Sequence, residues 1–388
     1  MINYQDRINN VMRQLPPPVT TKFFQAASTM KDCIILGIGE PDFKTPWRIR
    51  EAGIQSLEKG KTWYTDGNGM EKLKQAICAY QKRRFKLDYT PEEIMVTVGG
   101  SEGIDIFFRT VLNPGDEVIL PTPCYISYDP IAQLCGAKVV EIETKSQDDF
   151  RLTASQLKAA ITDKTKILVL PFPANPTGAI MEEDDLLEIA DVIKDTDIFV
   201  MTDEIYAELT YGEYHHVSFA SIPGMKERTV IINGFSKAYA MTGWRLGYAC
   251  GPKEIIDYMA SLHAVAIISA PTTSQYAAIV AMNECDEEIE MMRRQYDMRR
   301  RFLINELNSI GLECYNARGA FYVFADIRST GLSSLEFCER LMQESRVVVI
   351  PGIAFGKAGE GFVRISYSYS LDHLMEGTKR IDAFLKSL

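Results

Sequence analysis

The segment Ile198-Phe-Val-Met-Thr202, followed directly by Asp203-Glu-Ile-Tyr206, decides the fold class of this chain. It is a short apolar run, and polar residues follow at its end. Similar runs lie at 94–98, 117–120, 138–142, 166–170, 229–232 and 246–250. Most are separated by helix-like stretches such as 182–194. Strands that are apolar throughout belong to sheets covered on both faces, which are mainly parallel. We therefore expect an α/β fold whose large domain holds a mainly parallel seven-stranded sheet between helices.

The sequence pattern changes after about residue 285. A long charged helix is expected over 285–307, followed by apolar runs at 319–324, 346–350 and 362–365 with another helix among them. Ile34-Ile-Leu36 is strand-like and has no partner nearby in the sequence. We therefore expect an N-terminal arm over 1–45 that joins a small α+β domain over 286–388, and a large domain over 46–285.

Composition narrows the functional class. The chain has 388 residues with 52 acidic and 42 basic side chains, a formal net charge of −10. Nucleic-acid binders need clustered Lys and Arg, so this balance favours small-molecule chemistry. The N-terminus is polar, and the longest uncharged apolar stretch is far shorter than the ~20 residues that cross a bilayer. We expect no nucleic acid and no membrane as partners.

The eight cysteines are dispersed, with no CxxC pair and no metal-like spacing to the four histidines. Free thiols in a reducing compartment are the simplest interpretation. His215 and His216 are neighbours and cannot share one face, so they do not predict a metal site. We therefore expect a cytoplasmic protein without a bound metal.

Polar and glycine residues follow several of the predicted strands. Gly99-Gly100-Ser101 follows the run that ends at Val98, Tyr125 follows the run that ends at Leu120, and Asn175 follows the run that ends at Leu170. Asp203 and Ser236-Lys237 follow two more runs. In open α/β sheets, ligands bind beyond the carboxyl ends of the strands. The sequence thus predicts one site built from many strand ends.

Lys237 is the candidate nucleophile, within Ser236-Lys-Ala-Tyr-Ala-Met-Thr-Gly-Trp-Arg245-Leu-Gly247. A lysine just after an apolar strand is desolvated, so its pKa falls and its amine becomes reactive. Ser236 and Arg245 add a hydroxyl and a guanidinium, the groups that bind a phosphate. The alternative is an ordinary solvated strand end.

Two further turns are candidate binding elements. Gly99-Gly100-Ser101 leads from a strand into a helix-like segment and can bind an anion with backbone N–H groups, although a plain tight turn is the commoner case. It is not GxGxxG, and no P-loop motif occurs. Asp203 would need a cationic partner if buried, such as a protonated pyridine nitrogen; alternatively it caps a helix over 204–209. In such a helix Tyr206 would share its face.

Asn175 and Tyr125 are weaker candidates. Asn175, in Asn175-Pro-Thr-Gly178, offers an amide at a rigid turn, and turn chemistry alone would also explain it. The Tyr125 ring can lie flat against a planar ligand or serve as a core aromatic.

Together these motifs resemble the class I and II aminotransferases, the fold type I pyridoxal-phosphate enzymes, and most of all their prokaryotic aspartate and aromatic branch. The resemblance covers essentially the whole chain, and the spacing of 34 residues between Asp203 and Lys237 is highly specific. The matching segments are Gly37-Ile-Gly-Glu-Pro-Asp-Phe43, Tyr64-x-x-x-x-Gly69, Asn175-Pro-Thr-Gly178, Asp203-Glu-Ile-Tyr206, 236–247 and Arg364-Ile-Ser.

The resemblance implies a role for each candidate toward pyridoxal 5′-phosphate, which the large domain would bind. Lys237 would form the Schiff base and shuttle the substrate's proton. Asp203 would pair with the pyridine nitrogen, while Tyr206 and Asn175 would donate hydrogen bonds to the ring oxygen. Tyr125 would stack on the ring and border the substrate.

The remaining implied roles concern the phosphate, the carboxylate and the assembly. Gly100, Ser101, Ser236 and Arg245 would hold the phosphate. Tyr64 would reach the phosphate of a neighbouring subunit, which implies a homodimer with its sites at the interface. Arg364 would bind the substrate α-carboxylate, with Gly39 closing over it and Asn175 beside it.

One position departs from the family pattern. Dicarboxylate-preferring members carry a lysine after the Gly-Gly pair, where this chain has Ser101. We therefore expect a transaminase that moves the amino group of an aromatic or other neutral L-amino acid to a 2-oxo acid, with 2-oxoglutarate as the expected acceptor. The alternative on the same fold is a carbon–sulfur β-lyase, and a more remote one is a non-catalytic binding or regulatory protein.

Overall fold

The computed structural model describes residues 4–15, 21, 23, 25 and 30–388. Within these residues the central sheet has seven strands in the order β2-β8-β7-β6-β5-β3-β4. The strands are β2 (Ile94–Thr97), β3 (Glu117–Thr122), β4 (Lys138–Glu143), β5 (Thr165–Leu170), β6 (Phe199–Asp203), β7 (Thr229–Gly234) and β8 (Gly247–Cys250). Strands β3 to β7 pair in parallel, and β8 runs antiparallel to β2 and β7. The predicted α/β fold with a mainly parallel sheet is confirmed.

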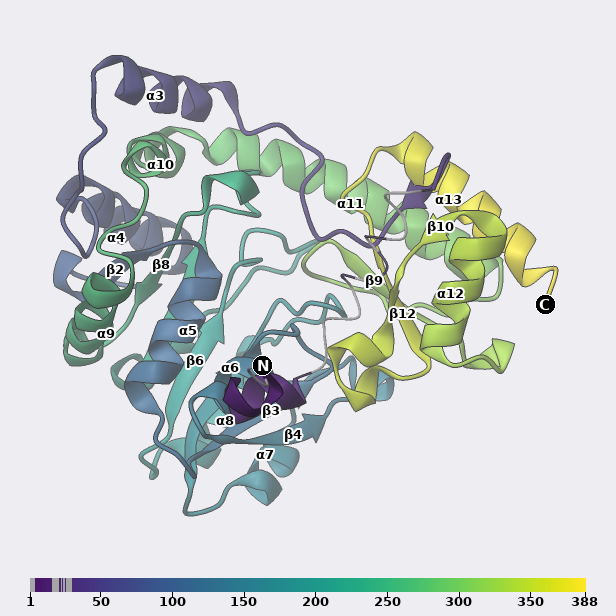
Figure 1. Cartoon of the computed structure of the whole chain (residues 1–388), viewed down its shortest axis with the longest axis horizontal. Helices are drawn as coiled ribbons and strands as arrows, with labels where there is room; N and C mark the ends of the chain where they lie inside the picture. Colours follow the sequence, from purple (N-terminus) through teal and green to yellow (C-terminus); the bar gives the residue numbers. More distant parts are fainter. Residues whose placement is uncertain (1–3, 16–20, 22, 24, 26–29) are drawn as a thin grey trace.

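Helices cover both faces of this sheet (Figure 1). Val230 and Ile232 of β7 pack in a core with residues of α5 and α9, whereas Ile231 packs with residues of α4 and α10 on the opposite face. This alternation explains why the strand is apolar at every position. The helices of this part are α3 (Trp47–Glu58), α4 (Glu71–Phe85), α5 (Gly100–Val111), α6 (Tyr128–Leu134), α7 (Ala154–Ala160), α8 (Glu183–Ile193), α9 (Lys253–Ala266) and α10 (Thr272–Glu284).

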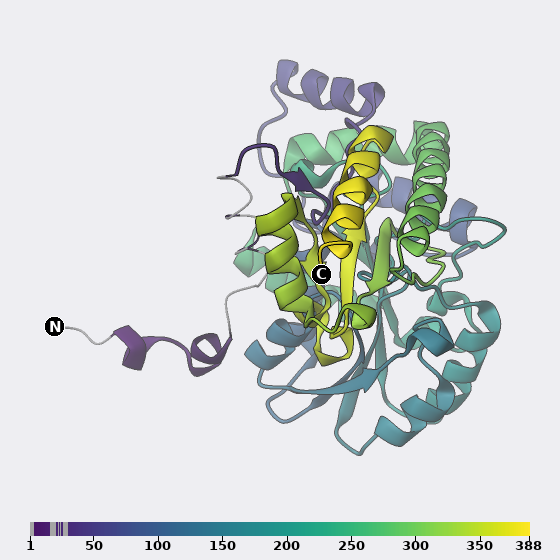
Figure 2. The same ribbon diagram turned by 90° about the vertical axis from the view of Figure 1, so that its right-hand side faces the viewer.

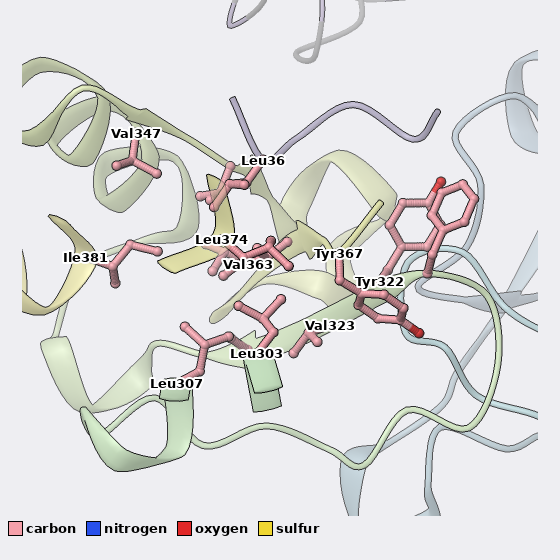
Figure 3. Close-up of a cluster of buried hydrophobic side chains, with 14 of the residues drawn as sticks. Leu36, Leu303, Leu307, Tyr322, Val323, Val347, Val363, Tyr367, Leu374 and Ile381 are labelled. Atoms are coloured by element: carbon pink, nitrogen blue, oxygen red, sulfur yellow. The ribbon is translucent and has the colours of Figure 1, made fainter. Parts of the chain in front are cut away.

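The C-terminal elements gather beside the sheet (Figure 1). They are α11 (Asp286–Ser309), β9 (Tyr322–Asp326), α12 (Ser334–Ser345), β10 (Val347–Val348), β11 (Ile350–Pro351), β12 (Phe362–Ser366) and α13 (Leu371–Leu385). Strands β11, β12 and β9 form an antiparallel sheet in that order. Its buried face shares a core with α11, α12 and α13, in which Val323, Val363 and Leu374 lie close together (Figure 3).

The N-terminal segment contributes to this same core. Strand β1 (Ile34–Ile35) pairs in parallel with β10, and Leu36 is fully buried among the C-terminal side chains (Figure 3). Further upstream, η1 (Tyr4–Arg7) and α1 (Asn10–Gln14) extend away from the body (Figure 2), and no residue of α1 is buried. Part of the expected 1–45 arm lies outside the described residues. The division at 45 and 285 stays a prediction.

Short 3₁₀ turns complete the chain. They are η2 (Pro91–Glu93), η3 (Ser146–Asp148), η4 (Phe219–Ser221), η5 (Lys226–Arg228), η6 (Thr242–Trp244), η7 (Arg328–Thr330), η8 (Gly352–Phe355) and η9 (Lys357–Gly359). In the described part of the chain, no helix combines the length and apolarity that a bilayer crossing requires.

Candidate active site

A cavity of about 440 Å³ lies beyond the carboxyl ends of the parallel strands. Its volume is in the range of small-molecule sites. Its walls come from the central sheet, the segment 37–40 and the C-terminal strands. The predicted site residues that line it are Gly39, Gly100, Ser101, Tyr125, Asn175, Asp203, Tyr206, Ser236, Lys237, Arg245 and Arg364.

Lys237 extends into this cavity from the turn after β7. Its Nζ donates a hydrogen bond to the Gly39 carbonyl oxygen at 2.5 Å. Burial lowers the pKa of the Lys237 amine to about 8, and the positive charge of Arg364 acts in the same direction. A substantial fraction of this amine is therefore neutral and nucleophilic near physiological pH.

Asp203 is the last residue of β6 and is 9% exposed. Its Oδ2 accepts a hydrogen bond from the Tyr128 hydroxyl at 2.6 Å, and its Oδ1 accepts one from the Ile205 backbone N–H at 3.2 Å. Burial raises the pKa of the Asp203 carboxyl, against the effect of these hydrogen bonds. Among the described residues no lysine, arginine or histidine forms an ion pair with Asp203. Its carboxylate would be stabilised by a cation in the cavity.

The segment after Asp203 differs from the helix considered for 204–209. These residues form turns, so Asp203 caps no helix there. Tyr206 nevertheless lines the same cavity as Asp203, because the chain turns directly after the strand. Its hydroxyl lies 2.7 Å from the Tyr322 hydroxyl.

Arg364 is buried in the middle of β12, with 6% of its surface exposed. Its Nη1 donates to Asn175 Oδ1 at 2.7 Å, and its Nη2 donates to the Gly37 carbonyl oxygen at 2.6 Å. Its guanidinium lies over the Tyr322 ring, 4.3 Å from the centroid. A buried guanidinium that faces a cavity is suited to a bidentate pair with a carboxylate.

A candidate anion site lies where β2 leads into α5. Gly99 has φ of 76°, which favours glycine and allows the chain to turn sharply so that α5 begins at Gly100. A Cβ on Gly99 would lie 2.8 Å from Arg245 Nη2, so the guanidinium lies close to this turn. The N-terminus of a helix beside an arginine and the Ser236 hydroxyl suits a phosphate.

The two predicted tyrosines Tyr125 and Tyr64 differ in their relation to the cavity. The Tyr125 ring lines the cavity and meets the Tyr128 ring edge-on, with centroids 5.6 Å apart. Tyr64 does not line the cavity of its own chain, and 72% of its surface is exposed. Its expected role toward a neighbouring subunit stays a prediction.

Tyr128 and Tyr322 also line the cavity, and neither was predicted from the sequence. Tyr128 lies at the start of α6, three residues after Tyr125, and Tyr322 lies in a run whose pattern predicted only a buried strand. Both reach the site through contacts with residues distant in sequence, Asp203 and Tyr206 respectively. A single sequence carries no signal for such contacts.

Comparisons with known proteins agree with this geometry. The model of the family described as aminotransferase class I and II matches residues 31–381. An aspartate aminotransferase of Pyrococcus abyssi is 42% identical over 373 residues, which cover 95% of this chain and 96% of that protein. Aromatic-amino-acid aminotransferase 2 of Thermococcus litoralis is 40% identical over 382 residues, or 98% of each chain.

The structures agree as well. The crystal structure of an aromatic aminotransferase from Pyrococcus horikoshii has a TM-score of 0.90 at 42% identity, and the match covers 94% of this chain and 99% of that one. The match therefore spans nearly the whole fold. The chain belongs to the family of class I and II aminotransferases, and it is a pyridoxal-phosphate-dependent transaminase.

Proposed function

We propose that this enzyme transfers the α-amino group of an aromatic or other neutral L-amino acid to a 2-oxo acid, with 2-oxoglutarate as the expected acceptor. The observation that carries the proposal is the pair formed by Lys237 and Asp203. A lysine whose pKa is lowered to about 8 shares one cavity with a buried carboxylate that has no ion-pair partner among the described residues. This pair suits an aldehyde cofactor that bears a basic ring nitrogen.

The cavity fits pyridoxal 5′-phosphate at both ends of the molecule. Asp203 would hold the protonated ring nitrogen, which would compensate its buried charge. Gly100, Ser101, Ser236 and Arg245 would hold the phosphate at the start of α5. When bound, the cofactor would draw electrons from the substrate Cα and so make its proton acidic.

The ring itself would be held between side chains of the cavity wall. Tyr125 would stack on one face, since its ring borders the cavity next to Tyr128. Tyr206 and Asn175 would donate hydrogen bonds to the ring oxygen. These contacts would fix the plane of the ring relative to Lys237.

Lys237 would then act as the base and the acid of the reaction. Its neutral Nζ would take the proton from the substrate Cα, hold it and return it within the cavity, while the bound cofactor would retain the amino group as the keto acid leaves. The lowered pKa favours this role, because the amine accepts and returns a proton near neutral pH. A second keto acid would reverse the same steps.

Arg364 would orient the substrate by its α-carboxylate, with Gly39 closing over it. The guanidinium already donates to Asn175 Oδ1 and to the Gly37 carbonyl oxygen. A carboxylate that enters here would replace the carbonyl as the acceptor at Nη2 and form the stronger, charge-assisted bond. The Cα would thereby be placed near Lys237.

The positively charged side chains that line the cavity favour an amino acid with a neutral side chain as the amino-group donor. The lining residues with a positive charge are Lys237, Arg245 and Arg364, and each has a role assigned above. Ser101, at the start of α5, offers a hydroxyl where an aspartate-preferring enzyme of the family would offer a lysine. The distal carboxylate of aspartate would therefore lack a cationic partner from this chain, which costs affinity.

A homodimer is part of the proposal. Trp63 and Tyr64 are 60% and 72% exposed, and a partner subunit that covers them would bring Tyr64 to its own phosphate site. We also place the enzyme in the cytoplasm, a location that the eight free cysteines support.

The function is tested with Lys237→Ala. The wild-type protein should bind pyridoxal phosphate covalently, whereas the variant should lose the absorbance of the lysine-bound cofactor. Its transaminase rate should fall by ~10²–10⁴-fold or more. Circular dichroism establishes that the variant is folded. Turnover equal to the wild type would refute the assignment.

Substrate class is tested with a panel of amino acids. We expect the cofactor spectrum to change to the pyridoxamine form faster with phenylalanine, tyrosine or leucine than with aspartate. Faster conversion by aspartate would contradict the donor class. Keto acid that accumulates over many turnovers without any amino acceptor would indicate the β-lyase instead.

A further inference from the structure

Tyr322 is a buried tyrosine that the roles above leave without a function. It is the first residue of β9, has 1% of its surface exposed and lines the cavity. Its side chain lies at the edge of the C-terminal core (Figure 3), next to that of Tyr206 from the central-sheet part. A hydroxyl in this position joins two parts of the site, one that follows β6 and one that lies on β9.

The hydroxyl of Tyr322 lies 2.7 Å from the hydroxyl of Tyr206. Each phenol has one proton to donate and can also accept, so only one of the two protons lies between the oxygens. If the Tyr206 proton is directed at the cofactor ring oxygen, Tyr322 must be the donor to Tyr206. A hydroxyl that accepts such a bond becomes a stronger donor itself.

The ring of Tyr322 has a separate contact. The Arg364 guanidinium lies 4.3 Å from its centroid, within the distance of a cation–π interaction. The fit is tight on the remaining side, because a Cβ on Gly39 would lie 2.1 Å from the Tyr322 hydroxyl oxygen. One side chain thus touches the group proposed to bind the α-carboxylate and the group proposed to bind the ring oxygen.

We propose that Tyr322 is a positioning residue with two separable parts: its hydroxyl directs the Tyr206 proton toward the cofactor, and its ring seats the Arg364 guanidinium. This inference rests on the proposed function, in which Tyr206 donates to the ring oxygen and Arg364 binds the α-carboxylate.

The surrounding charges keep the Tyr322 hydroxyl protonated. Burial raises the pKa of Tyr322, while Arg364 on β12 and the hydrogen bond with Tyr206 oppose that rise and Tyr125 adds to it. The Lys237 Nζ is another nearby basic group and lies 6.0 Å from the centroid of the Tyr206 ring. Tyr322 therefore acts as a neutral donor over the working pH range.

Two substitutions separate the two parts. Tyr322→Phe removes the hydroxyl and keeps the ring, whereas Tyr322→Leu removes both. In a pH titration of the lysine-bound cofactor absorbance, Tyr322→Phe should raise the apparent pKa by about half a unit, because a weakened Tyr206 bond stabilises the ionised ring oxygen less. The KM for an α-amino acid should stay within about twofold for Tyr322→Phe and rise roughly fivefold or more for Tyr322→Leu.

A double variant tests whether the hydroxyl acts through Tyr206. In a Tyr206→Phe background, Tyr322→Phe should cause no further shift of the titration. Tyr367→Phe is the matched control: this fully buried tyrosine of the same core donates to the Ala320 carbonyl oxygen at 3.1 Å and does not line the cavity. It should leave the titration unchanged.

The possible outcomes separate a failure of the role proposed for Tyr322 from a failure of the proposed function. A Tyr322→Phe titration equal to the wild type, a shift that persists in the Tyr206→Phe background, or an equal shift in Tyr367→Phe would each overturn the role of the hydroxyl. Equal KM values for Tyr322→Leu and Tyr322→Phe would overturn the role of the ring. A wild-type protein that binds no cofactor would instead refute the proposed function.

Discussion

At the scale of single residues, the Lys237 amine links reactivity to the stability of the folded chain. Its pKa is lowered from 10.5 to about 8 by burial and by Arg364. In the unfolded chain the amine has its ordinary pKa, so between about pH 8 and 10.5 the unfolded state binds more protons than the folded state. Stability rises with pH wherever this holds. The cost of the buried charge is therefore fully present below pH 8 and is relieved above it.

We expect this cost to be measurable in the cofactor-free enzyme. Relative to Lys237→Met, the wild-type free energy of unfolding should increase by ~1–2 kcal/mol from pH 7 to pH 10, a value reduced for partial exposure of the amine. Denaturant unfolding of both proteins at each pH gives the difference. A constant difference across this range would show that the amine is not perturbed.

The role proposed for Arg364 predicts a difference between substrates with and without an α-carboxylate. Its substitution by alanine should lower kcat/KM for α-amino acids by roughly 10²-fold, since it removes two charge-assisted hydrogen bonds. The rate with simple amines, which have no carboxylate, should change much less. Equal losses for both substrate types would remove Arg364 from the carboxylate site.

Residues that directly follow strands could be recognised from the sequence, because strand ends predict where a ligand binds. Lys237, Asp203, Asn175 and Gly100 all line the cavity as expected. Tyr322 could not be recognised, since its hydroxyl meets Tyr206 only after distant parts of the chain have packed together.

At the scale of elements, the approach of β8 to the start of α5 fixes the turn at the candidate anion site. A Cβ on Gly247 would lie 2.6 Å from the Gly99 carbonyl carbon and 2.7 Å from the Gly100 backbone nitrogen. Both are backbone atoms, so the strand lies against the turn with no space for a side chain. The turn is thereby held in the position that directs the α5 N-terminus at the cavity.

Gly247→Ala should therefore displace this turn and weaken pyridoxal phosphate binding. Overpacking of ~1–3 kcal/mol predicts a Kd about 5- to 150-fold higher. Gly243→Ala is the control, because no atom lies within 4 Å of a Cβ at that position. Fluorescence titration with the cofactor measures both variants, and similar Kd values for them would contradict the steric argument.

The strands themselves were predictable because each buried strand is apolar along its whole length. All seven predicted runs form strands of the central sheet. The antiparallel direction of β8 was not predictable, since its apolar sequence resembles that of its parallel neighbours. The turns at 204–209 were also missed, because Ile205, Tyr206 and Leu209 all pack against the C-terminal core and so imitate a helix pattern.

At the scale of the whole molecule, the proposed homodimer makes each site depend on two chains. Tyr64 is too exposed to serve the cavity of its own subunit. If it completes the phosphate site of the partner, a subunit that lacks Lys237 can still supply Tyr64 to a partner that has Lys237.

Mixed dimers of Lys237→Ala and Tyr64→Ala subunits should therefore regain one wild-type site. After dissociation and reassembly of the two variants, cofactor affinity at half of the mixed dimers' sites should return to the wild-type value. Each variant alone should stay impaired. A mixture no better than the average of the two variants would contradict the shared site, and light scattering establishes the assembly.

Assembly and domain boundaries were the least predictable features. A single sequence marks exposed aromatics such as Trp63 no differently from buried ones, because both are simply apolar. The pairing of β1 with β10 joins residues at opposite ends of the chain, and only the lack of a nearby partner for Ile34 hinted at it.

The pairing of β1 with β10 determines when the site can form during translation. Strand β1 emerges early from the ribosome, but its partner at Val347–Val348 follows only 313 residues later, as the pair Ile34 and Val347 shows. At ordinary elongation speeds this delay is roughly 15–60 s. Until then the segment 37–40, whose carbonyl groups meet Lys237 and Arg364, has no anchored strand before it. The nascent enzyme is thus kept from closing its site until β10 has been synthesised.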